Sequence, residues 1–139
     1  VVDWVSTLRL QTKLKRLPAI VLPAVVTVLS RTWGGRITGQ SAPIDMRRLD
    51  LVRSAALLRI PILIMHSVDD GYVPIGASRS LAQARPDLVQ LVEFVQAHHV
   101  RLWNLDPQRW EGSIDTWLMA LDAAWSAASA STGRRSRRS

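Results

Sequence analysis

The 139-residue chain contains no cysteine and no long apolar run. Without cysteine it can form neither disulfide bonds nor thiolate metal sites, although this absence alone does not identify a compartment. The longest apolar stretch, residues 17–29, has about 13 residues and contains two prolines, whereas a membrane-spanning helix needs about 20. We therefore expect no membrane span.

Acidic residues are also few, with 11 against 18 basic ones, which gives a net charge of +7. Four of the basic residues lie in the last six positions, and without them the net charge of +7 becomes +3. No aromatic residue stands among these arginines, as a stacking platform for nucleic acid would require. We therefore expect residues 129–139 to be a disordered basic tail and expect no nucleic acid as a partner.

The rest of the composition is that of a globular protein, with 47% hydrophobic and 21% charged residues. The apolar run 60–65 predicts a buried strand, residues 75–85 a helix and residues 88–95 a second buried strand. Asp106 and Pro107 are typical of a helix start. The order strand, helix, strand, helix predicts an α/β fold with parallel strands.

The final helix carries large apolar residues three and four positions apart, which we expect to pack against the sheet: Trp110, Ile114, Trp117, Leu118, Leu121 and Trp125.

The first third of the chain looks more helical than extended. Residues 1–4 resemble the end of a buried strand, and an amphipathic helix is expected over residues 4–16. A second helix should begin at Pro18, which suits a first helical turn. Three glycines favour a loop over residues 31–43, and a short helix is expected over residues 54–58.

Two polar loops follow the two predicted strands, over residues 66–74 and 97–104. In a parallel sheet, sites form beyond the carboxyl ends of the strands. An aspartate on the first loop and a histidine 29 residues later can then meet, so that the carboxylate accepts the imidazole Nδ1–H and fixes its tautomer. Each loop offers two neighbouring candidates, listed in order: Asp69, Asp70, His98 and His99.

Residues 62–74 read Ile-Leu-Ile-Met-His-Ser-x-x-Asp-x-x-Val-Pro, which resembles the strand-and-acid motif of the α/β-hydrolases. Ser67 stands where that family more often has glycine. The histidine loop, followed by Trp-Asn-x-Asp-Pro at residues 103–107, is similar to the C-terminal part of bacterial lysophospholipase- and esterase-like hydrolases. The resemblance covers roughly residues 1–122.

The resemblance implies a role for each candidate. The Asp-x-x-Val-Pro register makes Asp70 the acid of a catalytic triad and leaves Asp69 as the alternative. The Val-x-x-Trp-Asn register makes His99 the base and leaves His98 as the alternative. His66, at the end of the strand, is expected to be a structural hydrogen-bonding residue.

The nucleophile expected of this family is missing, because no Gly-x-Ser-x-Gly elbow occurs in residues 1–139. Ser41 lies in the nearest approach to that pattern, but it follows helices, and we interpret it as a loop residue. The opening Val-Val-Asp-Trp resembles the strand that follows the nucleophile's helix. We therefore expect the nucleophile and the oxyanion-hole donors to lie upstream of Val1.

Together these features predict the C-terminal part of an α/β-hydrolase sheet, with about three parallel strands and a helical cap. Residues 1–4 would be a strand of the core, residues 5–45 the cap, residues 46–128 the C-terminal core and residues 129–139 the tail. The expected function is hydrolysis of carboxylic esters, lipids and lysophospholipids among them, with no activity in the chain alone. No cofactor and no metal ion are implied, since the three histidines do not form a convincing ligand set.

The expected partners are a small-molecule ester, the missing N-terminal half that carries the nucleophile, and a second copy pairing through an open strand edge at residues 1–4. The alternative function is a small basic binding module without catalysis, or a decayed hydrolase remnant. Salt-dependent binding to DNA would favour that alternative.

Overall fold

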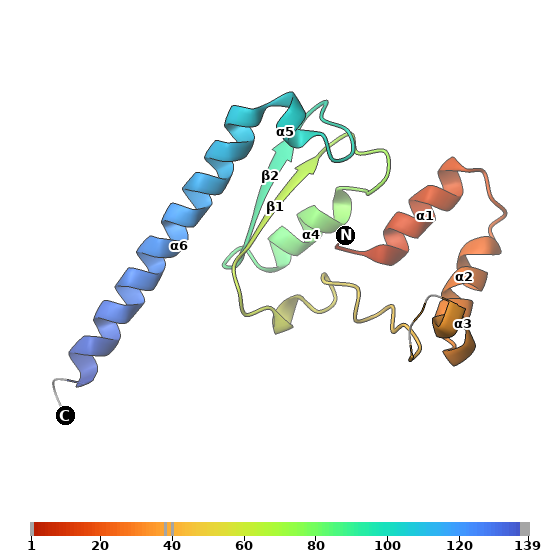
Figure 1. Ribbon diagram of the computed structural model, residues 1–139, viewed down its shortest axis with the longest axis horizontal. Coiled ribbons are helices and arrows are strands. Elements are labelled where there is room, and N and C mark those ends of the chain that lie inside the picture. Colours follow the sequence, from red (N-terminus) through yellow and green to blue (C-terminus); the bar gives the residue numbers. More distant parts are fainter. Residues whose placement is uncertain (1, 38, 40, 137–139) are drawn as a thin grey trace.

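The computed structural model, which describes residues 2–37, 39 and 41–136, is a mixed α/β structure built around two parallel strands (Figure 1). Strand β1 (Ile62–Ser67) pairs with strand β2 (Val89–Phe94), in a register from Ile62 opposite Val89 to Ser67 opposite Phe94. Helix α4 (Gly76–Ala84) connects them, as predicted. The α/β class is thus confirmed, but the described residues form two strands where about three were expected.

The strand boundaries follow from the residues at their ends. Strand β1 begins two residues later than the apolar run, after Pro61, which has no N–H to give to a ladder. The amide of Ile62 donates to the Leu88 carbonyl at 2.8 Å and starts the pairing. The predicted short helix is a single 3₁₀ turn, η1 (Ala55–Leu57). Arg85 ties it to the end of α4 by donating to the carbonyls of Ala55 and Leu58 at 2.8 and 2.9 Å.

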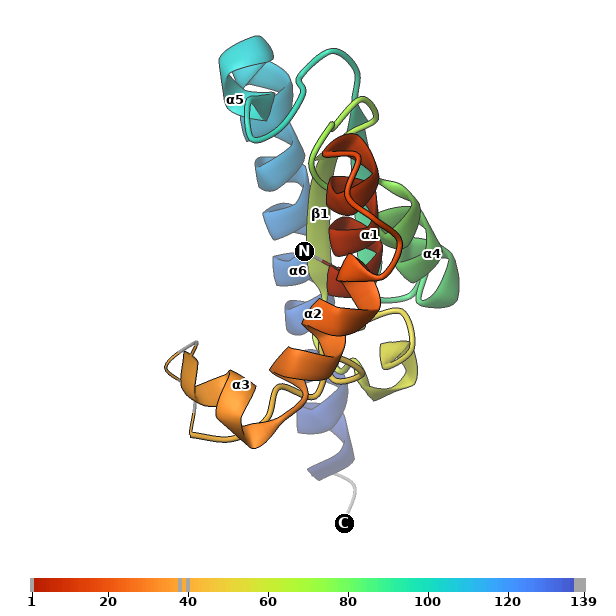
Figure 2. The same ribbon diagram turned by 90° about the vertical axis from the view of Figure 1, so that its right-hand side faces the viewer.

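Helices α4 and α6 cover opposite faces of the two strands (Figure 2). The core is small, and its buried apolar residues in the described part are Ala55, Leu81, Val89, Phe94 and Ala97. The strands themselves are mostly half-buried. We had expected them to be buried on both faces, and the difference arises because a sheet of two strands is too narrow to shield them fully.

Helix α6 (Pro107–Ser136) begins as predicted, with the Asp106 carboxylate accepting the Arg109 amide at 3.0 Å. Its apolar residues are less buried than expected: Leu118 is 50% exposed and Trp125 is 76% exposed, while Trp110, Ile114, Trp117 and Leu121 are half-buried. The reason is visible in Figure 1, where the helix continues well past the end of the short sheet. The helix is described as far as Ser136, within the segment for which the sequence predicts a disordered tail, and the last three residues lie outside the described part. Helix α5 (Leu102–Leu105) precedes it.

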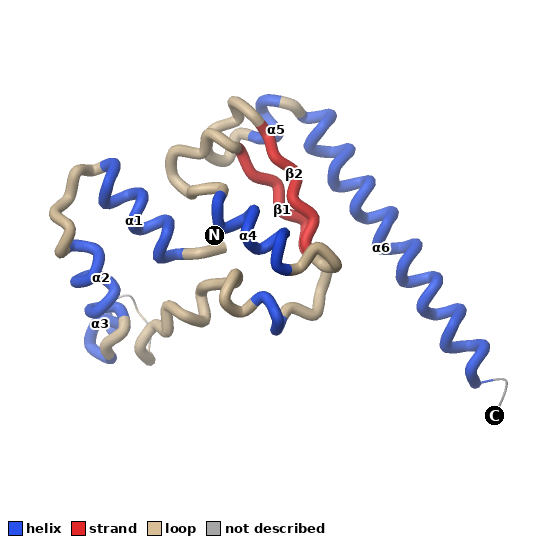
Figure 3. Tube along the Cα trace, turned by 180° about the vertical axis from the view of Figure 1, so that it is seen from behind, coloured by secondary structure: helices blue, strands red, loops and turns tan. Residues whose placement is uncertain are grey.

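The N-terminal third forms a helical segment beside the sheet, comprising α1 (Trp4–Leu14), α2 (Val21–Leu29) and α3 (Thr32–Ile37) (Figure 3). The structure differs here from the strand predicted over residues 1–4. Trp4 is helical, and Asp3 makes only an isolated antiparallel bridge with Asp50. The cause is helix capping, because the Asp3 carboxylate accepts the Val5 amide at 2.9 Å. Val1 lies outside the described residues.

Proline and glycine in this segment act differently from the prediction. Helix α2 starts at Val21, so Pro18 lies in the preceding turn and Pro23 falls in the first helical turn. Residues 31–43 were expected to be loop, yet they contain α3. Gly34 is needed there for close packing, since a Cβ at this position would lie 1.8 Å from the Val28 carbonyl oxygen.

Within the described part of the chain, β1 pairs with β2 alone and leaves its other edge open. The open edge predicted for residues 1–4 therefore belongs to β1, and self-association through it stays a prediction. Across the described residues, no helix has the length and hydropathy needed to cross a membrane.

Candidate active site

Asp70 and His99 meet at the carboxyl ends of the two paired strands. The His99 Nδ1 atom lies 2.9 Å from Asp70 Oδ2 and 3.1 Å from Asp70 Oδ1. The Asp70 side chain is 8% exposed and the His99 side chain 36% exposed. The structure thus brings together the two residues that the family register selects, at hydrogen-bonding distance.

The Asp70 carboxylate is anchored by its own loop. Its Oδ1 atom accepts the backbone amides of Tyr72 at 2.8 Å and Val73 at 3.0 Å. Burial by itself raises the pKa of Asp70, but the hydrogen bonds from His99, Val73 and Tyr72 outweigh it and bring that pKa below its ordinary value. Asp70 is therefore ionised at neutral pH.

This arrangement fixes the tautomer of His99. An ionised carboxylate can only accept hydrogen bonds, so Nδ1 carries a proton, and in the neutral ring the lone pair is therefore on Nε2. The Tyr72 ring lies beside the imidazole, with 4.9 Å between ring centroids. Among the described residues, no serine or threonine hydroxyl hydrogen-bonds to His99. An imidazole held in this way can act as a base through Nε2.

Asp69 and His98, the alternative pair, also contact each other. The His98 Nδ1 atom lies 2.8 Å from Asp69 Oδ2, and the two side chains are 65% and 35% exposed. The hydrogen bond from Ser67 is the largest influence on Asp69, and together with those from backbone amides and the charge of His98 it lowers the pKa of Asp69 despite partial desolvation. Two neighbouring acid–histidine pairs thus form, and the Asp70–His99 pair is the more shielded from solvent.

Ser67 links the acid loop to the histidine loop. Its hydroxyl, which is almost fully buried, donates to Asp69 at 2.6 Å and accepts the Ala97 amide at 3.2 Å. Asp69 in turn accepts the Gln96 amide at 3.0 Å. The sequence marks Ser67 only as a departure from glycine, because its link to Ala97 joins positions 30 residues apart.

The backbone around His99 is strained. Gln96, His98 and Val100 have φ angles of 66°, 52° and 53°, in the left-handed region that residues other than glycine seldom adopt. Each such residue costs about 1–2 kcal/mol. The bonds from Ser67 and Asp69 to this loop help to offset that cost, and strain of this kind tends to gather at functional sites.

His66 has the environment expected of a structural residue. Its Nδ1 atom lies 2.9 Å from the Ser78 hydroxyl, and its Nε2 atom lies 3.0 Å from the Val73 carbonyl oxygen. The Nε2 atom is also 3.5 Å from Asp70 Oδ2. His66 therefore joins α4 to the acid loop and supports the turn that holds Asp70.

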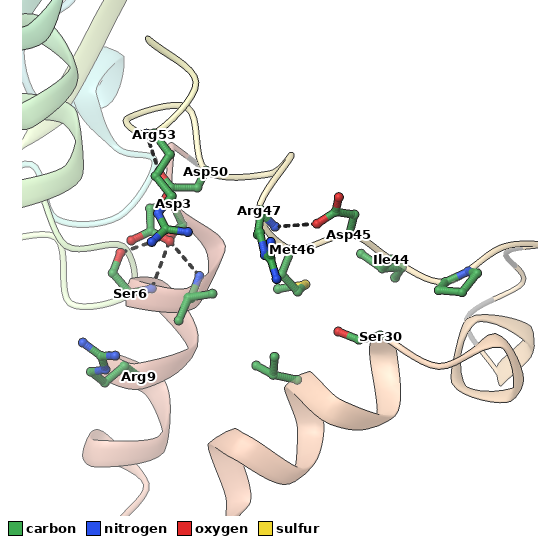
Figure 4. Close-up of a pocket in the computed structure, with 13 residues that line it drawn as sticks. Asp3, Ser6, Arg9, Ser30, Ile44, Asp45, Met46, Arg47, Asp50 and Arg53 are labelled. Carbon is green, nitrogen blue, oxygen red and sulfur yellow. Dashed lines mark hydrogen bonds and ion pairs between the residues drawn. The ribbon is translucent and has the colours of Figure 1, made fainter.

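A cavity of about 260 Å³ adjoins the pair and is lined by both histidines of the loop, by Asp70 and by apolar residues such as Met65 and Leu102. A larger hollow of about 830 Å³ lies elsewhere, between α1, α2 and residues 43–53 (Figure 4). Its lining includes three arginines and three aspartates but no histidine. The larger hollow is thus not the place where the acid and the base meet.

Two further expectations concern residues outside this pair. Ser41 is exposed and lines neither the cavity beside His99 nor the larger hollow. In the part of the chain that the structure describes, no three residues of the types that bind metal are grouped closely enough to hold an ion.

The lowered pKa of Asp70 gives a testable pH dependence. The pKa of Asp70 is lower in the folded chain than the ordinary aspartate value of about 3.9, so the ionised form of Asp70 stabilises the fold. That stabilisation is complete above about pH 5 and is lost as pH falls through the ordinary value and then the folded one. We expect Asp70→Asn to flatten the decline in the free energy of unfolding between about pH 5 and pH 3, measured by urea denaturation. An unchanged slope would contradict the assignment. Asp87→Asn is the matched exposed control: Arg85 lowers the pKa of Asp87 away from the site, but solvent screens that pair, so we expect a clearly smaller change in slope than at the shielded Asp70.

The site thus combines a shielded acid, an oriented imidazole and an adjoining cavity. Two short loops at the ends of the paired strands position all three. Comparison of the chain with protein-family models, with curated proteins and with solved structures gave no match.

Proposed function

We propose that this chain supplies the acid and the base of a Ser-Asp-His carboxylic ester hydrolase and corresponds to the C-terminal part of an α/β-hydrolase. The observation that carries the proposal is the hydrogen bond from His99 Nδ1 to a carboxylate that is itself held by two backbone amides. Its position beyond two adjacent parallel strands supports the proposal, since sites in such sheets form there.

In this mechanism His99 Nε2 removes the proton from a serine hydroxyl as the serine oxygen attacks the ester carbonyl carbon. Asp70 stays ionised and stabilises the imidazolium that forms. The imidazolium then gives its proton to the departing alcohol, which leaves an acyl-serine. In the second half His99 takes a proton from water, the resulting hydroxide oxygen attacks the acyl carbon, and the serine regains its proton as the acid is released.

We infer that the serine lies on a segment outside these 139 residues, because they contain no Gly-x-Ser-x-Gly elbow. The open edge of β1 and the cavity beside His99 are the surfaces such a segment would meet. The helical segment α1–α3 would then serve as the cap. One contact supports this: the Gln11 side chain donates to the Tyr72 carbonyl at 3.0 Å, which ties α1 to the acid loop.

The first test measures hydrolysis of p-nitrophenyl esters by the purified chain. We expect no turnover above background, since loss of the nucleophile costs about 10⁶ in rate. His99→Ala is the control for slow reaction of the imidazole itself with an activated ester. Turnover that a fluorophosphonate blocks would show a nucleophile within the chain and would overturn this part of the proposal.

The complementary test adds a segment that carries the elbow, encoded directly upstream. We expect the mixture, or the joined chain, to hydrolyse the same esters and to be labelled by fluorophosphonate on the added serine. A joined chain that folds cooperatively but shows neither activity nor labelling would contradict the hydrolase proposal and leave the non-catalytic alternative.

A further inference from the structure

One surface of the helical segment is unusual in both charge and exposure. Residues 4–44 contain six basic residues and no aspartate or glutamate. Three of these bases lie at the end of α1 and just after it: Lys13 in its last turn, and Lys15 and Arg16 in the connection to α2. We define residues 13–20 as the α1–α2 corner. All eight of its residues are exposed.

Large apolar side chains are interleaved with these bases. Leu14 is 57% exposed, Leu17 is 44% exposed and Ile20 is 72% exposed. The corner projects at the outer rim of the molecule, away from the strands, in both Figure 1 and Figure 3. The patch therefore combines apolar and cationic side chains on one protruding turn.

The turn has a defined conformation. Arg16 has a φ angle of 51°, and the amides of Arg16 and Leu17 donate to the carbonyls of Lys13 and Thr12 at 3.1 and 2.9 Å. This is the Schellman pattern of a helix end, which normally places an apolar side chain back against the helix. Here Leu17 remains substantially exposed. The exposure thus belongs to a hydrogen-bonded turn.

The mixture of charge and apolar surface distinguishes between possible partners. Burial against an apolar surface of another protein would desolvate three cations. This is costly because the segment has no acidic residue to pair with them. At a lipid surface, leucine and isoleucine side chains can enter the acyl region while lysine and arginine reach the headgroups. Anionic headgroups add about a fivefold gain in affinity for each basic residue.

We propose that the α1–α2 corner docks this protein on the surface of an anionic lipid bilayer. The corner lies one helical turn beyond Gln11, which contacts the loop of Asp70. A docked bilayer would therefore lie near the mouth of the site and favour lipid esters as substrates. That last step rests on the proposed function, whereas binding of the corner to lipid does not.

The test is co-sedimentation of the full chain with vesicles of phosphatidylcholine, with and without about one-third phosphatidylglycerol. We expect binding to the anionic vesicles only. The combined change Lys13→Ser, Lys15→Ser, Arg16→Ser should weaken it about a hundredfold. The combined change Leu14→Ser, Leu17→Ser, Ile20→Ser should weaken it at least tenfold, because the apolar contribution is lost.

Matched controls use the same number of substitutions elsewhere. Arg134→Ser, Arg135→Ser, Arg137→Ser removes three charges from the C-terminal segment, and Leu118→Ser, Met119→Ser, Trp125→Ser removes three exposed apolar side chains from α6. Both controls should keep most of the binding. If the controls lose binding and the corner variants keep it, or if no variant matters, the proposal is overturned. If the unmodified chain binds duplex DNA but no vesicles, and the corner variants lose that DNA binding, the surface would be assigned to nucleic acid instead.

A second readout uses single substitutions and so does not depend on whether the triple variants fold. Because the chain has no cysteine, Ile20→Cys can carry one environment-sensitive fluorophore, with Leu57→Cys, at a position 73% exposed, as the control. We expect a blue shift on anionic vesicles for the label at position 20 only. An equal shift at both positions, or none at position 20, would contradict docking through the corner. Ester hydrolysis without vesicle binding would refute this inference and leave the proposed function intact.

Discussion

Replacement of His99 by alanine is expected to lower kcat/KM for ester hydrolysis by about 10⁶ in the enzyme reconstituted with its nucleophile-bearing segment. The loss is large because the imidazole both removes the serine proton and delivers it to the leaving group. Asp70→Asn should cost about 10⁴, since an amide in that place favours the wrong tautomer of His99. The measurement is steady-state hydrolysis of p-nitrophenyl esters near neutral pH.

The neighbouring pair supplies the matched controls. His98→Ala and Asp69→Asn remove the same chemical groups one residue away, from a pair that is more exposed to solvent. We expect each to lower the rate by less than about tenfold, through the positioning of the loop alone. If these variants lose activity and those at 99 and 70 do not, the pair of Asp69 and His98 is the catalytic one.

The chain by itself offers an independent check of the same geometry. Imidazole ¹⁵N spectra, recorded at a pH high enough for the ring to be neutral, should show the His99 proton on Nδ1, because Asp70 accepts from that atom at 2.9 Å. Asp70→Asn should abolish this preference. A proton on Nε2 in the unmodified chain would contradict the proposed base before any nucleophile is found.

The second large effect concerns stability. Leu81 on α4 is 0% exposed and packs against Ala55 and Val89 in a core with few other buried apolar residues. We expect Leu81→Ala to lower the free energy of unfolding by about 2–5 kcal/mol. A loss of that size is a large part of the stability of a small domain, so the melting temperature should fall by roughly 10 °C or more.

The control for this loss is Leu57→Ala, which makes the same chemical change at a leucine that is 73% exposed. It should change the free energy of unfolding by less than about 0.5 kcal/mol. Urea denaturation followed by circular dichroism measures both variants. Equal effects at the two positions would mean that the core lies elsewhere than around Leu81.

The strands, the α4 crossover and the start of α6 could be predicted from the sequence because each depends on local chemistry. A short apolar run bounded by turn residues predicts a buried strand. Asp106 and Pro107 predict a helix start because the aspartate side chain caps the helix itself. The contact between Asp70 and His99 was also predictable, because parallel strands carry their following loops to the same edge of the sheet.

Other features were decided by specific contacts that composition and periodicity do not reveal. Residues 1–4 have the composition of a strand, yet the Asp3 carboxylate caps α1 instead. Gly34 suggests a loop, but it lies against Val28 in a helix. The spacing on α6 predicts a buried stripe, but the helix continues past a sheet that is too short to cover it.

The sequence by itself therefore determined the α/β class, the order of its central elements, and which aspartates and histidines could form an acid–base pair. Only the tertiary structure decided that both neighbouring pairs form and that the pair of Asp70 and His99 is the better shielded. It alone also revealed the Ser67 bridge and the left-handed residues around His99. The physical reason is that spacing along a chain determines which side chains can meet, whereas burial, hydrogen-bond direction and backbone strain depend on all the segments packed around them.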